Sequence, residues 1–197
     1  MIQRPEFHRQ SPSLPFINRL FLALFPDAGA VKDISSLATT LRQQHGLTGG
    51  MRPPDQWHVT LHWFGDYYDV PERVVQAAGK ASDAVAARMP AFDVKLDSVT
   101  SFRGLPGNHP LVLMRNGEGN ATLMKFHQVL TAELTKRQCF NKSNARFNPH
   151  LTLFYDRQML RKTTVEPVRW TAGNIVLVRS EVGAAKYHRL EDWTLAG

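Results

Sequence analysis

Two short strings of the sequence carry the same polar side chains at the same spacing. Residues 58–61 read HVTL and residues 150–153 read HLTL, so each string is histidine, apolar residue, threonine, leucine. In a β-strand successive side chains point to opposite faces, so the histidine and the threonine of each string share one face. Two such strands lining one cleft would bring two imidazoles and two hydroxyls together.

These groups suit the hydrolysis of a phosphodiester. The attacking water must lose a proton, the leaving oxygen must gain one, and the charge on the phosphoryl oxygens must be stabilised. Because an imidazole can be acid or base near neutral pH, His58 and His150 can fill the first two roles in either order. The hydroxyls of Thr60 and Thr152 can donate hydrogen bonds to the non-bridging oxygens. The scheme requires no metal ion and no cofactor.

Chance does not easily produce the repeat. A chain of this composition is expected to contain about 0.06 copies of histidine-x-threonine-leucine. The alternative is that one string is accidental and that its histidine is structural. We favour the paired interpretation, because both strings lie in apolar runs suited to buried strands.

The composition indicates a globular protein with an anionic partner. The chain has 197 residues, 43% of them hydrophobic, and a formal net charge of +7. Such a charge favours nucleic acid, a nucleotide or an acidic membrane as partner. The single cysteine, Cys139, excludes an intrachain disulfide and a cysteine-rich metal site. No apolar stretch reaches membrane-spanning length, so we expect a cytoplasmic protein with no membrane partner.

The elements that must position the two strings can be read from periodicity and from turn residues. We expect a loosely ordered leader over residues 1–18 and a single folded domain over residues 19–197. Residues 19–25 are apolar on both faces, which is typical of a central strand. The motif strands should span 57–64, ending at Gly65, and 150–155. The remaining patterns predict helices over 27–46, 71–89 and 121–137 and strands over 92–102, 111–114, 175–182 and 185–190.

This order of elements predicts an α+β fold with antiparallel sheets and helices on the outside. The two motifs are separated by about half of the chain, so each half would contribute one. We therefore expect a bilobal, pseudo-two-fold arrangement of two sheets with a central cleft.

At this point the sequence resembles the two-histidine (2H) phosphoesterase superfamily. The resemblance is strongest to the RNA 2′,3′-cyclic phosphodiesterases, also called the 2′-5′ RNA ligase or LigT-like family. It is carried by the two motifs with their flanks, residues 52–65 and 147–153, by the opening strand 19–26, and by the closing stretch 180–190, which contains Tyr187. It covers roughly residues 19–195.

The resemblance implies a bilobal α+β fold and hydrolysis of an RNA 2′,3′-cyclic phosphate to a 2′-phosphomonoester. It implies that His58 donates a proton to the departing 3′ oxygen and that His150 accepts a proton from water. Thr60 and Thr152 would bind the phosphate. The partner would be an RNA or a nucleotide with a 2′,3′-cyclic phosphate, with no cofactor, and we expect a monomer.

Three further residues are candidates for contacts with the substrate. His62 should share the strand face of His58, where it could touch substrate or lower the pKa of His58; the alternative is a hydrogen-bonded histidine near the strand end. Arg179 has a defined face on its strand, and Tyr187 could stack on a base.

Two other functions stay open at this stage. The same chemistry could act on 2′-5′-linked oligonucleotides or on small nucleotide cyclic phosphates. The cleft could also be a non-catalytic module that binds RNA ends.

Overall fold

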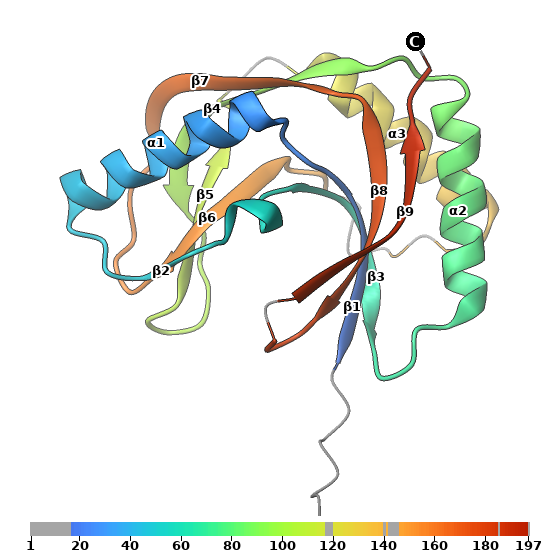
Figure 1. Ribbon diagram of the computed structural model, residues 1–197, viewed down its shortest axis with the longest axis horizontal. Helices are drawn as coiled ribbons and strands as arrows, with labels where there is room; N and C mark the ends of the chain where they lie inside the picture. Colours follow the sequence, from blue (N-terminus) through green and yellow to red (C-terminus); the bar gives the residue numbers. More distant parts are fainter. Residues whose placement is uncertain (1–16, 117–119, 140, 142–145, 185, 197) are drawn as a thin grey trace, which may run out of the picture.

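The strands of the protein pair into two antiparallel sheets (Figure 1). The computed structural model describes residues 17–116, 120–139, 141, 146–184 and 186–196. The first sheet has the order β3-β1-β8-β9, with β1 Asn18–Leu24, β3 Val59–Tyr67, β8 Asn174–Glu181 and β9 Lys186–Thr194. The second has the order β2-β6-β5-β4-β7, with β2 Gly50–Met51, β4 Phe92–Ser101, β5 His109–Met114, β6 His150–Asp156 and β7 Thr163–Ala172. The predicted α+β class with two antiparallel sheets is confirmed.

Strand β1 is central, as the apolar run predicted. It pairs with β3 on one side and with β8 on the other. Leu20, Leu22 and Leu24 point into the main core, whereas Phe21 and Ala23 pack on the opposite face in a smaller cluster. Phe21 and Tyr187 of this smaller cluster also line the cavity described below.

Three helices cover the outer faces of the sheets (Figure 1): α1 Ala28–His45, α2 Glu72–Ala86 and α3 Ala121–Lys136. The carboxylate of Asp27 caps α1 by accepting a hydrogen bond from the backbone of Ala30 at 2.8 Å. Gly46 ends α1 with φ of +60°, a conformation that glycine adopts readily. Helix α1 packs against β7, α2 packs against β8 and β9, and α3 packs against α2 and β4.

Each motif strand carries a β-bulge at the leucine of its motif. On β3, His62 lies opposite Leu22 and Thr60 lies opposite Ala23, so Leu61 is the extra residue. On β6, Phe154 lies opposite Leu111 and Thr152 lies opposite Val112, so Leu153 is the extra residue. A bulge places two residues of one strand against one residue of its partner, which shifts the alternation of faces beyond it.

The structure differs from the predicted elements most clearly at four strands, of which the short β2 was not predicted. Strand β3 continues through Gly65, at φ of +149°, to Tyr67 instead of ending there. Strand β9 runs on to Thr194, and strand β7 was not predicted at all. Strand β7 is mostly exposed and contains Pro167, features that weaken a strand signal in sequence. It tolerates the proline because it is an edge strand paired only with β4.

One continuous hydrophobic core joins the two sheets and the three helices. It contains Leu22 of the first sheet, Leu113 and Leu153 of the second, Ile34 of α1 and Phe126 of α3. Strand β1 begins at Asn18, and residues 1–16 of the expected leader lie outside the described residues. Among the described residues, no helix combines the length and the apolar character needed to cross a membrane.

Candidate active site

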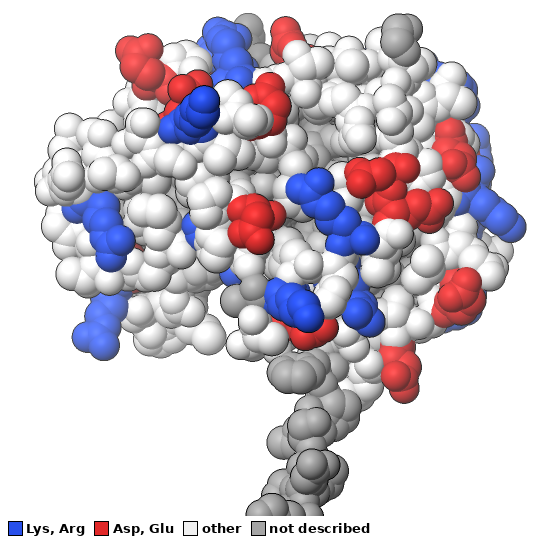
Figure 2. Space-filling view, in the orientation of Figure 1, with Lys and Arg blue, Asp and Glu red and all other residues white. Residues whose placement is uncertain are grey.

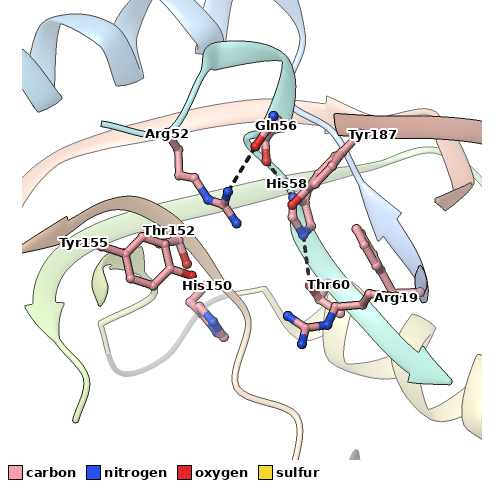
Figure 3. A pocket seen from close by; sticks show the side chains of 10 residues that line it. Arg19, Arg52, Gln56, His58, Thr60, His150, Thr152, Tyr155 and Tyr187 are labelled. Carbon is pink, nitrogen blue, oxygen red and sulfur yellow. Dashed lines mark hydrogen bonds between the residues drawn. The ribbon is translucent and has the colours of Figure 1, made fainter. Parts of the chain in front are cut away.

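The two motifs meet at one cavity between the sheets (Figure 3). It has a volume of about 150 Å³. His58 and Thr60 reach it from the start of β3, and His150 and Thr152 reach it from β6. The full lining is Arg19, Phe21, Arg52, Gln56, His58, Thr60, His150, Thr152, Tyr155 and Tyr187. The four motif side chains that the sequence analysis singled out therefore line the same space.

The backbone orients His58 through a single short hydrogen bond. Its Nδ1 lies 2.7 Å from the carbonyl oxygen of Gln56, the last residue of the 3₁₀ turn η1 Pro54–Gln56. Because a carbonyl can only accept, Nδ1 carries the hydrogen, and the neutral ring has its lone pair on Nε2. That Nε2 lies 3.1 Å from the hydroxyl oxygen of Thr60, which donates to it.

His150 is held in the same way. Its Nδ1 lies 2.8 Å from the carbonyl oxygen of Asn148, again two residues earlier in the chain. The same reasoning assigns the lone pair of neutral His150 to Nε2. Both motifs thus use the same backbone hydrogen bond to fix the tautomer. The lone pair of each neutral ring is on Nε2, which in His58 accepts from Thr60.

Aromatic rings pack against both imidazoles. Phe21 stacks on His58 with a centroid separation of 4.9 Å, and Tyr187 meets the same ring edge-on at 5.6 Å. Phe102 meets His150 edge-on at 5.0 Å. These contacts restrict the rotation of the rings, so the direction of each Nε2 is set before any ligand enters.

Burial makes both imidazoles hard to protonate. The pKa of His58 is lowered to about 4, first by burial and then by the positive charges of Arg52 and His150, although the Gln56 carbonyl favours the protonated ring. Burial also lowers the pKa of His150, against the opposing effect of the Asn148 carbonyl. In the unliganded cleft both rings are therefore neutral at pH 7.

Four polar residues of the cavity were missed by the sequence analysis: Arg19, Arg52, Gln56 and Tyr155. Arg52 donates from Nη1 to Oε1 of Gln56 at 3.1 Å, and its guanidinium lies 5.4 Å from the ring centroid of Tyr155. Arg52 stands six residues before His58, in a segment whose path depends on the loop. No periodicity predicts that it turns back toward the cavity.

The backbone of β6 holds the segment that carries Arg52. The amide of Arg52 donates to the carbonyl of Leu153 at 2.9 Å. The buried carboxylate of Asp156 accepts from the amide of Gly49. A Cβ at Gly49 would lie 1.9 Å from the carbonyl oxygen of Tyr155, so the two backbones approach as only glycine permits. Arg52 is thereby fixed to the strand that carries His150.

His62 does not share the cleft face of His58; the structure instead agrees with the alternative of a hydrogen-bonded histidine. The bulge at Leu61 turns His62 to the core face opposite Leu22, and its side chain is fully buried. Its Nε2 accepts a hydrogen bond from the amide of Asn141 at 3.1 Å, and its ring contacts Phe64. Phe154 is the matching residue of the second motif and is buried as well. His62 does not line the cavity.

The two remaining candidates have opposite outcomes. Arg179 lies opposite Leu20, whose side chain belongs to the main core, so it points away from the cleft. The neighbouring Val178 packs instead with Phe21 on the cleft face. Tyr187 does line the cavity, beside His58. Among the described residues, no group of three or more His, Cys, Asp and Glu side chains is placed to hold a metal ion.

Comparison with known proteins supports the fold and identifies a family. A family model described as the 2′-5′ RNA ligase superfamily matches residues 26–184. The fold is similar to that of Escherichia coli LigT complexed with 3′-AMP, with a TM-score of 0.71 and 21% identity over 92% of this chain and 99% of that one. It is also similar to a protein of Thermus thermophilus, with a TM-score of 0.70 and 22% identity over 91% of this chain and 98% of that one. No curated protein matches the sequence.

Proposed function

Since the chain belongs to the 2′-5′ RNA ligase superfamily, we propose that it hydrolyses RNA 2′,3′-cyclic phosphates to 2′-phosphomonoesters. One observation carries the proposal. Two imidazoles, each anchored through Nδ1, line a single cavity together with two threonine hydroxyls. The nucleotide in the LigT complex is consistent with a nucleotide ligand for this fold.

The proposed reaction transfers one proton at each histidine. Nε2 of His150 takes a proton from a water molecule as the water oxygen bonds to phosphorus. The bond from phosphorus to O3′ breaks, and Nε2 of His58 delivers a proton to that oxygen. The hydroxyls of Thr60 and Thr152 donate to the non-bridging oxygens, where negative charge increases in the transition state. The products are a 3′-hydroxyl and a 2′-phosphate.

The mutual repulsion of the two rings accounts for one acid and one base in the same cavity. An anionic phosphodiester raises the pKa of both imidazoles, because opposite charge stabilises the protonated ring. Protonation of one ring lowers the pKa of the other. A positive charge on His150 lowers the pKa of His58 in this way. The bound substrate therefore favours a pair that shares one proton. The donor role of His58 and the acceptor role of His150 follow the resemblance to the family.

The test is hydrolysis of an oligoribonucleotide that ends in a 2′,3′-cyclic phosphate. We expect His58→Ala and His150→Ala each to lower kcat/KM by roughly 10²- to 10⁴-fold, the usual contribution of a general acid or base. His45→Ala is the matched control, because His45 is exposed at the end of α1 and lines no part of the cavity. Addition of a chelator should leave the rate unchanged.

Two results would contradict the proposal. One is wild-type turnover in either single-histidine variant. The other is a 3′-phosphate product, which ³¹P NMR distinguishes from the 2′-phosphate, because it would mean that O2′ departs.

A further inference from the structure

A second hollow adjoins the histidine cavity at the turn between β8 and β9. It has a volume of about 210 Å³ and shares Arg19, Arg52 and Tyr187 with the cavity. The turn adds Ser180, Glu181, Val182 and Gly183. The histidine cavity, at about 150 Å³, is smaller than the pockets of roughly 300–1,000 Å³ that enclose a whole small molecule. A substrate with its phosphate between the histidines must therefore extend beyond them, and the shared residues border one such path.

Arg52 brings an unneutralised positive charge to this boundary. Its hydrogen-bond partner is the uncharged amide of Gln56, and its other close neighbour is the ring of Tyr155. The ion pairs formed among the described residues do not include Arg52. A guanidinium in this state keeps N–H donors and charge available for an anion.

Arg19 is the second guanidinium at the boundary, and its position is fixed. Its Nε and Nη2 donate to the carboxylate of Asp66 at 2.9 and 2.8 Å. This bidentate pair leaves Nη1 outside the pair. Figure 3 shows the guanidinium groups of Arg19 and Arg52 both directed into the pocket. The charge of Arg19 also acts on the phenol of Tyr187, as does that of Arg52.

The carboxylate of Glu181 is the acidic group in the hollow. It lies 2.6 Å from Nε2 of His188, so one of its oxygens is already bound. The lining therefore combines two guanidiniums, a phenol and a carboxylate that has its own partner. Since Arg19 is paired with Asp66 and Glu181 contacts His188, Arg52 is the residue of this lining that offers its charge to one anionic group.

Resting on the function proposed above, we propose that this hollow binds a second phosphate of the substrate. A nucleoside with a cyclic phosphate at its 2′ and 3′ oxygens can carry its next phosphate only on O5′. The preferred substrate is then a nucleotide or an oligonucleotide whose terminal nucleoside also bears a 5′-phosphate group. A nucleoside cyclic phosphate without this group has no second anion to place in the hollow.

The experiment uses two dinucleotides that differ only in charge. Both end in a 2′,3′-cyclic phosphate, but one has a phosphodiester between its nucleosides and the other has an uncharged methylphosphonate. We expect the wild-type protein to hydrolyse the phosphodiester with kcat/KM roughly 10- to 100-fold higher, the range of charge-assisted hydrogen bonds. In Arg52→Gln this ratio should fall to within about threefold of unity. Arg169→Gln, on the exposed side of β7 and outside both hollows, should keep it.

The possible outcomes separate this inference from the function on which it rests. Hydrolysis of both dinucleotides at equal kcat/KM by the wild-type protein overturns the second phosphate site and leaves the proposed function intact. A high ratio that survives in Arg52→Gln also overturns the assignment of this hollow. If neither dinucleotide is hydrolysed, the proposed function itself fails. The wild-type comparison requires no variant to fold.

Discussion

At the scale of single residues, the site depends on the side of each imidazole that carries its proton. His58 and His150 each donate Nδ1–H to the carbonyl two residues earlier, at 2.7 and 2.8 Å. The motif identified both rings from sequence, but the tautomer depends on backbone torsions of residues 56 and 148. Burial adds a second effect that sequence does not reveal, because it lowers both pKa values.

These lowered pKa values predict two pH profiles with different optima. The base must be unprotonated, so the rate rises with pH through its pKa; the acid must be protonated, so the rate falls as pH passes its pKa. The kcat/KM profile reports the free enzyme, in which both pKa values lie below 6.5, so its maximum should lie below pH 6.5. The kcat profile reports the complex, in which the phosphate anion raises both pKa values, so its maximum should lie at higher pH.

Steady-state kinetics from pH 4 to 9 on the cyclic-phosphate oligonucleotide would measure both curves. The His45→Ala control should reproduce them. A kcat maximum at or below the pH of the kcat/KM maximum would show that the phosphate does not act on the histidines as described.

At the scale of elements, two structural features decide which side chains face the cleft: the β-bulges and the attachment of one loop to β6. The bulges at Leu61 and Leu153 send the residues that follow them, His62 and Phe154, into the core instead of the cleft. A simple alternation of faces could not predict this, because a bulge depends on the pairing with β1 or β5. The second feature is the attachment of residues 48–52 to β6, which brings Arg52 to the cavity.

Asp156 is central to this attachment. Its side chain is 4% exposed. Burial opposes its charge, but backbone N–H groups, including those of Gln158 and Gly49, outweigh burial and hold the pKa of the carboxyl below 3.8. A carboxylate with several N–H donors is a strong and directional anchor for a loop.

We therefore expect Asp156→Asn to disturb both stability and substrate binding. The change should lower the free energy of unfolding by about 2 kcal/mol, as for loss of a hydrogen bond to a charged group. It should also raise KM about tenfold with little change in kcat, because Arg52 belongs to the proposed second phosphate site while the histidines stay in place. Urea unfolding and steady-state kinetics measure the two effects, with Asp83→Asn on the exposed face of α2 as control.

A double variant separates positioning from stability. In an Arg52→Gln background, Asp156→Asn should still lower the free energy of unfolding but should no longer raise KM. An equal rise of KM in both backgrounds would mean that Asp156 does not act through Arg52.

At the scale of the whole molecule, the cleft depends on two sheets that share one core. The continuous cluster contains Leu22 and Leu24 from β1, Leu113 from β5 and Leu153 from β6. Because the histidines stand on different sheets, the distance between their rings depends on how firmly this core holds the two sheets together. We expect residues 19–197 to unfold as one cooperative unit.

A core variant in one sheet tests this unity. Leu113→Ala in β5 removes a fully buried side chain and should cost about 2–5 kcal/mol. Amide hydrogen exchange should then show the same loss of protection in peptides of β1, in the other sheet. Leu105→Ala is the control, since that side chain is 73% exposed. A loss confined to the second sheet would show that the two sheets unfold independently.

The net charge of the chain does not show which basic residues reach the cavity. A charge of +7 predicted an anionic partner but could not choose among 24 lysines and arginines. On the face shown in Figure 2, acidic and basic groups are interspersed. The arginines that reach the cavity are Arg19 and Arg52, and the predicted Arg179 points to the other face of β8.

The sequence by itself determined the family, the side chains proposed to do the chemistry and most of the elements that hold them. Local patterns suffice for these, because the repeated motif, the apolar run of β1 and the caps of α1 act between residues close in the chain. Tertiary structure alone decided that both histidines face one cavity, that His62 turns inward and that Arg52 joins them. Those outcomes depend on contacts between distant segments, such as Gly49 with Asp156 and Leu61 against β1. The residue pattern of one strand does not show which neighbouring strand will pair with it, and the bulges depend on that pairing.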